Sequence, residues 1–261
     1  TDPTPIAKPR QFVIQGLTKD GRTFRPSDWA ERLASAMSCF RPDSGDASAR
    51  GIGAFIGYSP YCVPTVMAGV KSVIVSDILA AEGAKVVVSD VNEAAGREVV
   101  ARITKADGKA VFVRSDVSKS ADCEAMVGAA VDAFGTVDIL VNNIGLASVG
   151  TVVDTTEEAW DRAFAINLRT AFLACKHAVP VMAAKGAGAI VNISSISALR
   201  GDGTVAYSAA KGGLSAMTVD MAYSHGRQGI RVNAIAPGHI TTPMVLSVSG
   251  RGPRTEFTTT L

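Results

Sequence analysis

The sequence is poor in the features that mark several classes of protein. Only 6% of its 261 residues are aromatic and its formal net charge is +2, so no strong charge favours nucleic acid or an anionic membrane. No apolar run approaches the roughly 18 residues of a membrane span. The first residues also lack the charged-then-apolar layout of a secretory signal. We therefore expect a cytoplasmic protein with neither a nucleic-acid partner nor a membrane partner.

Cysteine is equally sparse. The four cysteines (Cys39, Cys62, Cys123 and Cys175) are scattered and form no Cys-x-x-Cys pair. This pattern predicts free thiols in a reducing compartment, packed as small hydrophobic residues, and no metal site. Hydrophobic residues, by contrast, make up 47% of the chain, which is enough for a sizeable core.

The first eighty residues read as a segment of their own. A proline-rich leader over residues 1–10 is expected to be disordered, and residues 11–78 to form a small α+β segment. The elements expected in that segment are a hairpin over 11–25, a helix from Pro26, a loop over 41–53, an irregular stretch over 58–64 and a strand over 71–77. The stretches 12–16, 24–29 and 58–61 resemble a small bacterial domain family of unknown function, which implies no activity.

A glycine-rich stretch over residues 44–53 has two interpretations. Glycine loops that bind a pyrophosphate use backbone N–H groups at a helix N-terminus, and they require a strand before and a helix after. Here the preceding residues complete a helix, and Pro60 and Pro64 would break a helix that followed. A plain loop is favoured over a phosphate-binding loop.

From residue 79 onward the pattern alternates between strands and helices, which is typical of a parallel α/β sheet. Strands are expected at 85–90, 110–114, 137–141, 189–195 and 231–236. A helix is expected to end over 79–84 with Gly83 as its stop, and others to cover 92–106, 118–134 (capped by Ser118) and a stretch to about His225 around Tyr207. A further helix should begin at a Thr155–Glu158 capping box and bend or end near Pro180.

Tyr207 and Lys211 stand four residues apart in a run of small residues. On a helix that spacing puts both side chains on one face, one turn apart. An ammonium beside a phenol lowers the pKa of the phenol, so the pair could exchange a proton with an alcohol or carbonyl oxygen near neutral pH. Taken alone, the spacing more often reflects a surface lysine and a packed tyrosine.

Several further motifs accompany this pair in a fixed order. They are Asp90 at a strand end, Asp116-Val117, Asn142-Asn143-Ile144-Gly145, Asn167, Ser194-Ser195, Tyr207-x-x-x-Lys211 and Asn233-Ala234-Ile235-Ala236-Pro237-Gly238. This ordered set resembles the short-chain dehydrogenase/reductase family over residues 79–247. The resemblance implies an α/β fold with a doubly wound, Rossmann-like, mostly parallel sheet, here preceded by the small α+β segment. It also implies a homo-oligomer, a dimer or tetramer.

The resemblance assigns four catalytic residues. Tyr207 is the expected acid/base, and Lys211 lowers its pKa and holds the nicotinamide ribose. Ser195 hydrogen-bonds the substrate oxygen, with Ser194 as a rival by spacing. Asn167 is expected to bend its helix and to hold a water that relays protons.

The resemblance also implies a nicotinamide cofactor. Asp90 would accept from the adenosine ribose and repel a 2′-phosphate, which favours NAD over NADP. Asp116 and Val117 resemble the adenine-pocket pair, and Asn142 and Gly145 the floor near the ribose, although Asn142 could equally serve only to pin neighbouring strands. The segment beside the nicotinamide is represented by Pro237, Gly238, Ile240 and Thr242.

Two parts of the family pattern are missing from the sequence. One is the first strand with its glycine loop, and the other is the C-terminal end, in whose place residues 248–261 read as a disordered tail. Residues 11–78 are therefore either a separate small domain or a replacement of the first strand and loop. The leading hypothesis is an oxidoreductase that moves a hydride between NAD(H) and a small secondary alcohol or ketone. The alternative is a catalytically silent fusion in which the N-terminal domain binds a partner and the remainder is a scaffold.

Overall fold

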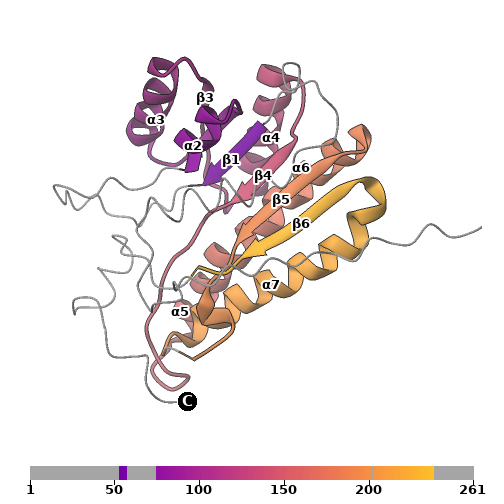
Figure 1. Ribbon diagram of the computed structural model, residues 1–261. Coiled ribbons are helices and arrows are strands. Elements are labelled where there is room, and N and C mark those ends of the chain that lie inside the picture. The colour runs from indigo at the N-terminus through magenta and orange to yellow at the C-terminus, as the bar shows by residue number, and fades with distance from the viewer. Residues whose placement is uncertain (1–52, 58–74, 202, 238–261) are drawn as a thin grey trace, which may run out of the picture.

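The computed structural model describes residues 53–57, 75–201 and 203–237 (Figure 1). Within these residues lie six strands: β1 (Gly53–Gly57), β2 (Lys85–Asp90), β3 (Lys109–Arg114), β4 (Ile139–Asn142), β5 (Gly188–Ile193) and β6 (Ile230–Ile235). The α-helices are α2 (Val75–Ala81), α3 (Glu93–Lys105), α4 (Ser120–Phe134), α5 (Glu157–Phe164), α6 (Thr170–Lys185) and α7 (Val205–His225). Shorter turns are the π-helical η1 (Ala165–Arg169) and the 3-10 turns η2 (Ile196–Ala198) and η3 (Gly226–Gln228).

The strands form one sheet in the order β3-β2-β1-β4-β5-β6, and neighbouring strands are parallel throughout. The chain winds outward from β1 to β3 and then returns to β4 on the other side of β1, which is the doubly wound order. Because right-handed crossovers in opposite directions use opposite faces, α2 and α3 cover one face and α4, α6 and α7 the other (Figure 1). The predicted fold class is confirmed.

Each face of the sheet has its own hydrophobic cluster. Leu79 and Ile103 of α2 and α3 pack on one face with Val86 and Val88 of β2. On the other face Val87 packs in the cluster formed by α4, α6 and α7. Val86, Val87 and Val88 are at most 5% exposed. This burial explains why β2 reads as a continuous apolar run instead of an alternating one.

The central strand of the sheet is β1, which the sequence did not predict. Residues 41–53 were predicted to be a loop, yet Gly53 begins a strand that pairs with β2 from Gly53↔Lys85 to Gly57↔Ser89 and with β4 at Ile56↔Val141. Only three apolar residues lie between the bounding glycines, which is too short a run for a strand pattern. A parallel ladder is made of backbone groups, so a segment without a recognisable strand pattern can still form the central strand.

A second correction concerns residues 71–77, which were predicted to be a strand. Val75, Ser76 and Asp77 instead form the first turn of α2. The valine-rich run suggested a strand, but Ser76 and Leu79 are buried three residues apart, which is the helical repeat. The helix ends as predicted, with Gly83 in the left-handed region at φ +88°.

Three helix boundaries also differ from the predictions. Thr156, not Thr155, is the N-cap of α5, and its side chain accepts from the backbone N–H of Ala159. The helix expected from Ser118 begins at Ser120, because the Ser118 hydroxyl donates to Asp116 instead of capping. Pro180 lies inside α6, which continues through it. The helices expected at 92–106 and around Tyr207, and the five expected strands, are confirmed to within two residues at each end.

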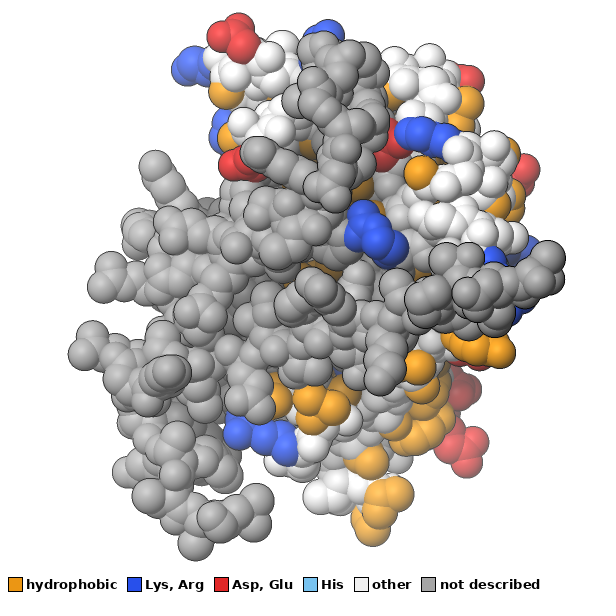
Figure 2. All heavy atoms as spheres, turned by 45° about the vertical axis from the view of Figure 1, so that its right-hand side comes forward, with side chains coloured by type: hydrophobic (Ala, Val, Ile, Leu, Met, Phe, Trp, Pro, Cys, Tyr) orange, Lys and Arg blue, Asp and Glu red, His pale blue; other side chains and the backbone are white. Residues whose placement is uncertain are grey.

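Several expectations lie outside the described residues. They are the leader, the hairpin and helix within 11–52, most of the glycine-rich stretch, the irregular stretch over 58–64 and the C-terminal tail. Among the described residues, Cys123 and Cys175 are free and buried, no group of side chains could hold a metal ion, and no helix is long and apolar enough to cross a membrane. Figure 2 shows acidic and basic side chains scattered over the described part of one face without a patch of one sign.

Candidate active site

The polar side chains predicted to be functional lie at one edge of the sheet. Asp90 is the last residue of β2 and Asn142 the last of β4, while Ser194 and Ser195 follow β5 directly. Because all strands run parallel, their carboxyl ends share this edge, which is where open α/β sheets bind ligands. The sheet therefore assembles residues that stand more than a hundred positions apart in the chain.

Lys211 is the most deeply buried charged side chain of this edge, at 2% exposure. Its Nζ donates to the carbonyl oxygen of Ile193 at 2.7 Å and to that of Ile144 at 3.0 Å. Burial lowers the pKa of the Lys211 ammonium to about 7. Within the described residues, two of its three N–H donors are thus engaged, one by the last residue of β5 and one by the segment after β4, and the third has no acceptor.

Tyr207 lies one turn before Lys211 on α7 and is 9% exposed. The Lys211 Nζ is 5.9 Å from the centre of the Tyr207 ring. The predicted helix therefore places the two side chains on one face, and α7 brings both to the carboxyl edge of the sheet. A cation at this range favours negative charge on the phenol.

Asn167 sits in the π-helical turn η1, between α5 and α6, and is 1% exposed. Its Nδ2 donates to the carbonyl oxygens of Leu146 and Ala163 at 3.0 and 2.9 Å, and its Oδ1 accepts from the N–H of Leu146 at 2.9 Å. The helix thus widens at Asn167, as single π-turns often do at functional sites. These bonds fix the amide against the loop after β4.

Gly145 lies between the two buried polar groups. A Cβ on Gly145 would stand 3.6 Å from Asn167 Oδ1 and 3.8 Å from Lys211 Nζ, both ordinary contact distances. The Asn167 oxygen and the Lys211 nitrogen therefore flank one small space that a larger side chain would fill.

Ser194 and Ser195 have different surroundings. The Ser194 hydroxyl donates to the carbonyl oxygen of Lys211 at 3.0 Å and lies 2.8 Å from the hydroxyl of Ser215, so it ties β5 to α7. Ser195 Oγ donates to Ser197 Oγ at 3.1 Å and accepts from the Ser197 N–H at the same distance. Ser195 is 8% exposed, and both of these contacts join it to the first turn of η2, not to α7.

A pocket lies at the carboxyl ends of β2 and β3. Its wall includes Ser89, Asp90, Asp116, Val117 and Ile144, together with Ile166 of the π-turn and Thr170, the first residue of α6. Burial raises the pKa of the Asp90 carboxyl, against hydrogen bonds from the N–H groups of Asn92 and Val91 that lower it. The Ser89 hydroxyl is buried and has no hydrogen-bond partner among the described residues. A carboxylate, a buried hydroxyl without a partner and an apolar wall fit the adenosine half of a dinucleotide.

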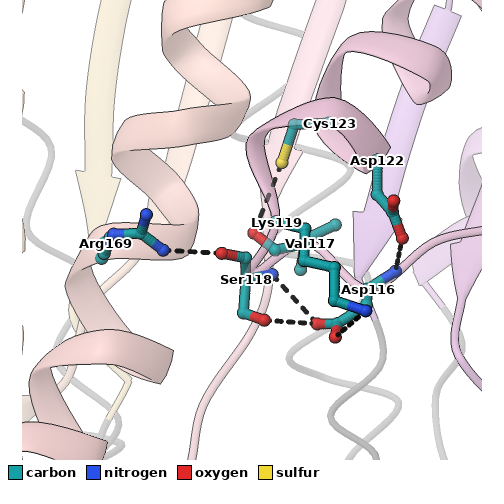
Figure 3. A network of polar contacts seen from close by, with 7 residues as sticks. All are labelled: Asp116, Val117, Ser118, Lys119, Asp122, Cys123 and Arg169. Atoms are coloured by element: carbon teal, nitrogen blue, oxygen red, sulfur yellow. Dashed lines mark hydrogen bonds and ion pairs between the residues drawn. The ribbon is translucent and has the colours of Figure 1, made fainter.

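The carboxylate of Asp116 mainly holds the loop that forms one wall of this pocket. Its Oδ1 accepts from the hydroxyl and N–H of Ser118 at 2.6 and 3.2 Å, and the Lys119 ammonium is 3.5 Å from its Oδ2 (Figure 3). The Ser118 hydroxyl is the main reason that the pKa of Asp116 is lowered. The backbone is held from outside as well, because Arg169 Nη1 donates to the Ser118 carbonyl at 2.6 Å and the Asp122 carboxylate accepts from the Asp116 N–H at 2.7 Å.

Asn142 is 6% exposed and faces the core. Its Nδ2 donates to Asn192 Oδ1 at 2.8 Å and contacts the Cys175 sulfur at 3.4 Å. Asn192 in turn donates to the Thr218 hydroxyl of α7 at 2.9 Å. This chain of bonds supports the interpretation in which Asn142 pins neighbouring strands.

Comparison with known proteins assigns the chain to a family. Residues 74–259 match the family model described as enoyl-(acyl carrier protein) reductase, one of the short-chain dehydrogenases/reductases. The chain belongs to the short-chain dehydrogenase/reductase family. Residues 8–91 match a second model, described as a protein of unknown function.

Relatives of this short-chain dehydrogenase/reductase are named for oxidoreductase activities. Trans-4-hydroxycyclohexanecarboxylate dehydrogenase of Sinomonas cyclohexanicum is 43% identical over 176 residues, 65% of this chain and 68% of that protein. Cyclopentanol dehydrogenase of Comamonas sp. is 40% identical over 172 residues, 66% of this chain and 69% of that protein. A crystal structure assigned to the family, from Burkholderia xenovorans, superposes with a TM-score of 0.69 at 36% identity and covers 76% of this chain and 78% of that one. The chain thus matches about two thirds of the length of these curated relatives.

The structure of this short-chain dehydrogenase/reductase brings together Asn167, Gly145, Tyr207 and Lys211 at one place. Asp90, Asp116 and Val117 lie at a neighbouring pocket. Pro237 accepts from the N–H of Ile196 at 2.9 Å and so lies beside η2, whereas Gly238, Ile240 and Thr242 lie outside the described residues.

Sequence reasoning missed two groups of residues. The carbonyls of Ile144 and Ile193 that hold Lys211 carry no side-chain signal. Ile166 of the π-turn and Thr170 at the start of α6 line the pocket, and the Thr170 hydroxyl donates to the Ile166 carbonyl at 2.6 Å. Their spacing of four residues across Asn167 was the one available signal, but it reads equally as an ordinary helix face.

Proposed function

We propose that this protein is an oxidoreductase that transfers a hydride between NAD(H) and a small secondary alcohol or ketone. The observation that carries the proposal is the Lys211 ammonium, buried at the ends of the strands and one helical turn from Tyr207. A desolvated ammonium is costly to keep unless it serves a charge that forms during a reaction. The relatives named for hydroxycyclohexanecarboxylate and cyclopentanol support a cyclic alcohol as the substrate class.

Bound NAD(H) would supply or accept the hydride. The Tyr207 hydroxyl would donate its proton to the carbonyl oxygen in reduction and accept the proton of the alcohol in oxidation. Lys211 would stabilise the phenolate form, and its third N–H is available for a ribose hydroxyl. Ser195 would donate to the substrate oxygen, for which its O–H must turn away from Ser197.

We further propose that the space beside Gly145 holds a water that connects Asn167 to Lys211. Among the described residues, Asn167 Oδ1 accepts one hydrogen bond, from the Leu146 N–H, so a lone pair remains for a water. The Lys211 proton could then be replaced from outside through that water. The buried position of Asn167 in a π-turn supports this role.

The adenosine half of the cofactor would lie against Asp90, Val117 and Ile144. A carboxylate at Asp90 would accept from the ribose hydroxyls and repel a 2′-phosphate, so NAD is proposed over NADP. A homo-oligomer is proposed as well, because Trp160, Phe172 and Tyr223 on α5, α6 and α7 are 38%, 50% and 86% exposed. The free thiols Cys123 and Cys175 support a reducing, cytoplasmic location.

Titration with NADH and NADPH, followed by the fluorescence of the reduced nicotinamide, tests the proposal. We expect micromolar affinity for NADH and weaker affinity for NADPH. The Asp90→Ser variant should narrow that difference, because it removes the charge that repels the 2′-phosphate. Absent or millimolar binding of both cofactors would overturn the proposal. It would instead favour the scaffold alternative, which the comparisons do not support.

A further inference from the structure

A groove of about 580 Å³ opens beside η2, at the end of α7 that carries Tyr207. We call it the η2 groove. Its described walls are formed by Gly150, Thr151, residues 197–201 and 203–205, Ser208 and Ala209. Two of the wall segments are joined by backbone bonds, since the Gly150 N–H donates to the Gly203 carbonyl at 2.9 Å and the Val205 N–H to the Gly150 carbonyl at 3.2 Å.

The groove adjoins the proposed reaction centre. Ser197 in its wall is bonded through both its N–H and its hydroxyl to Ser195 Oγ. Ser208, also in the wall, follows Tyr207 directly on α7. A molecule in the η2 groove therefore lies against the same two segments that hold the proposed catalytic hydroxyls.

Arg200 is the one charged residue among the described residues that line this groove. Its side chain has no hydrogen bond or ion pair within the described part of the chain. Its backbone is fixed, because the Arg200 N–H donates to the Ile196 carbonyl at 3.1 Å and the Ile196 N–H donates to Pro237 at 2.9 Å. A guanidinium on a fixed turn is a ready partner for a planar anion.

The remainder of the groove offers apolar and small neutral groups. Leu199, beside Arg200, is 59% exposed, and the other apolar residues of the wall are Ala198, Val205 and Ala209. The Asp154 carboxylate, which accepts from the Thr151 hydroxyl, is not among the residues that line the groove. Asp202 lies outside the described residues.

We propose that the substrate of this site is a carboxylate-bearing alicyclic alcohol or its ketone, with Arg200 binding the carboxylate. The apolar rim suits a carbon ring, and the single guanidinium matches a single negative charge, where a phosphate would call for more than one cation. Arg200 and Ser195 flank the short turn η2, which places the partner of the carboxylate and the proposed donor to the reacting oxygen on one segment. This inference rests on the proposed oxidoreductase function and names its substrate class.

The test compares trans-4-hydroxycyclohexanecarboxylate with trans-4-methylcyclohexanol, which has the same ring and no charge. In wild type the acid should have the higher kcat/KM. In Arg200→Gln that value should fall about 10- to 100-fold, as expected for loss of a charge-assisted hydrogen bond, while the value for the neutral alcohol stays within about twofold. Arg227→Gln, on the exposed turn η3, removes the same charge elsewhere and should leave both values unchanged.

A binding measurement separates this inference from the proposed reaction. Saturation-transfer NMR of the same two compounds needs no turnover. Preferential binding of the acid that is lost in Arg200→Gln supports the η2 groove as a carboxylate site even if neither compound is oxidised, in which case the proposed function alone falls. Equal binding of both compounds, or acid binding that survives Arg200→Gln, would overturn the inference.

Discussion

Asn142 donates a 2.8 Å hydrogen bond from its Nδ2 to Oδ1 of Asn192, and the two residues are partners in the parallel ladder of β4 and β5. Both side chains are buried, Asn192 completely. The pair stands at the same edge of the sheet as Lys211 and turns toward α6 and α7 through Cys175 and Thr218. The Asn142–Asn192 hydrogen bond therefore joins two strands at a position where a cofactor contact was expected.

Replacement of Asn142 by alanine tests this assignment. The variant leaves Asn192 Oδ1 buried without its donor, which should cost about 1 to 3 kcal/mol in the free energy of unfolding measured with urea. NADH affinity should change little. Asn143→Ala, at the next and less buried position, is the control and should cost less than about 0.5 kcal/mol. A large loss of NADH affinity with unchanged stability would instead make Asn142 a cofactor residue.

The buried Lys211 predicts a pH dependence of stability. Its pKa is lowered to about 7 in the folded protein, while the unfolded chain keeps the ordinary value, so the unfolded chain binds more protons between these two pH values. The free energy of unfolding should therefore rise with pH across that window. This can be measured by urea unfolding of wild type and Lys211→Met at pH 6.5, 8 and 9.5. The free energy of unfolding of wild type should rise relative to that of the variant as the pH increases. Parallel curves for the two proteins would mean that the ammonium is not destabilised by burial.

Tyr207→Phe should abolish alcohol oxidation and leave NADH affinity nearly unchanged. Phenylalanine keeps the ring against α7 and removes only the hydroxyl that would exchange the proton. Steady-state kinetics and fluorescence titration on the same preparation measure both quantities. Residual turnover within about tenfold of wild type would show that Tyr207 is not the acid/base, because positioned acid–base groups contribute about 10² to 10⁴ in rate.

Gly145 provides a graded test of the proposed water. Alanine at this position places its Cβ at ordinary contact distances from Asn167 and Lys211, whereas valine would fill the space between them. We expect Gly145→Ala to retain most of the activity and Gly145→Val to lose kcat with a smaller effect on NADH affinity. A solvent isotope effect on kcat that differs between the two variants would support loss of a proton path. Equal activity of both variants would rule out a water at this place.

A packing prediction concerns the turn after α7. Gly229 has φ +76°, and a Cβ there would overlap the backbone carbonyl oxygen of Gly186. Gly229→Ala should lower the free energy of unfolding by about 2 to 4 kcal/mol, because backbone must move as well as adopt a left-handed conformation. Gly135→Ala is the matched control, with φ +84° and open space around its Cβ, and should cost only about 1 kcal/mol. Similar losses in both variants would argue that strain at φ alone sets the cost.

What the sequence predicted well was local. The helix carrying Tyr207 and Lys211 and the strand before Asp90 depend on patterns within about ten residues, and both are present. The capping position shifted from Thr155 to Thr156 because adjacent threonines are equally suitable N-caps. The pairing of Asn142 with Asn192 could not be predicted, since it joins residues fifty positions apart.

The π-turn at Asn167 limited the prediction of the pocket. A π-turn adds one residue to a helical turn, so a 3.6-residue repeat assigns the following side chains to the wrong face. Ile166 and Thr170 therefore went unrecognised as pocket residues. The strand β1 was not predicted for another reason. Its pairing with β2 and β4 uses backbone groups, which leave no pattern in the side chains.

The part of the chain that folds as one sheet begins earlier than the part that resembles a dehydrogenase, because β1 precedes residue 74. Similarity to the dehydrogenase model begins at residue 74, whereas the strand at the middle of the sheet comes from residues matched by the other model. A protein cut at residue 74 would keep every side chain of the proposed catalytic group. Its sheet, however, would be divided into a β3-β2 pair and a β4-β5-β6 triplet with two unpaired inner edges. The boundary at which this chain could be shortened or grafted therefore lies upstream of Gly53, inside the stretch that carries no dehydrogenase signature.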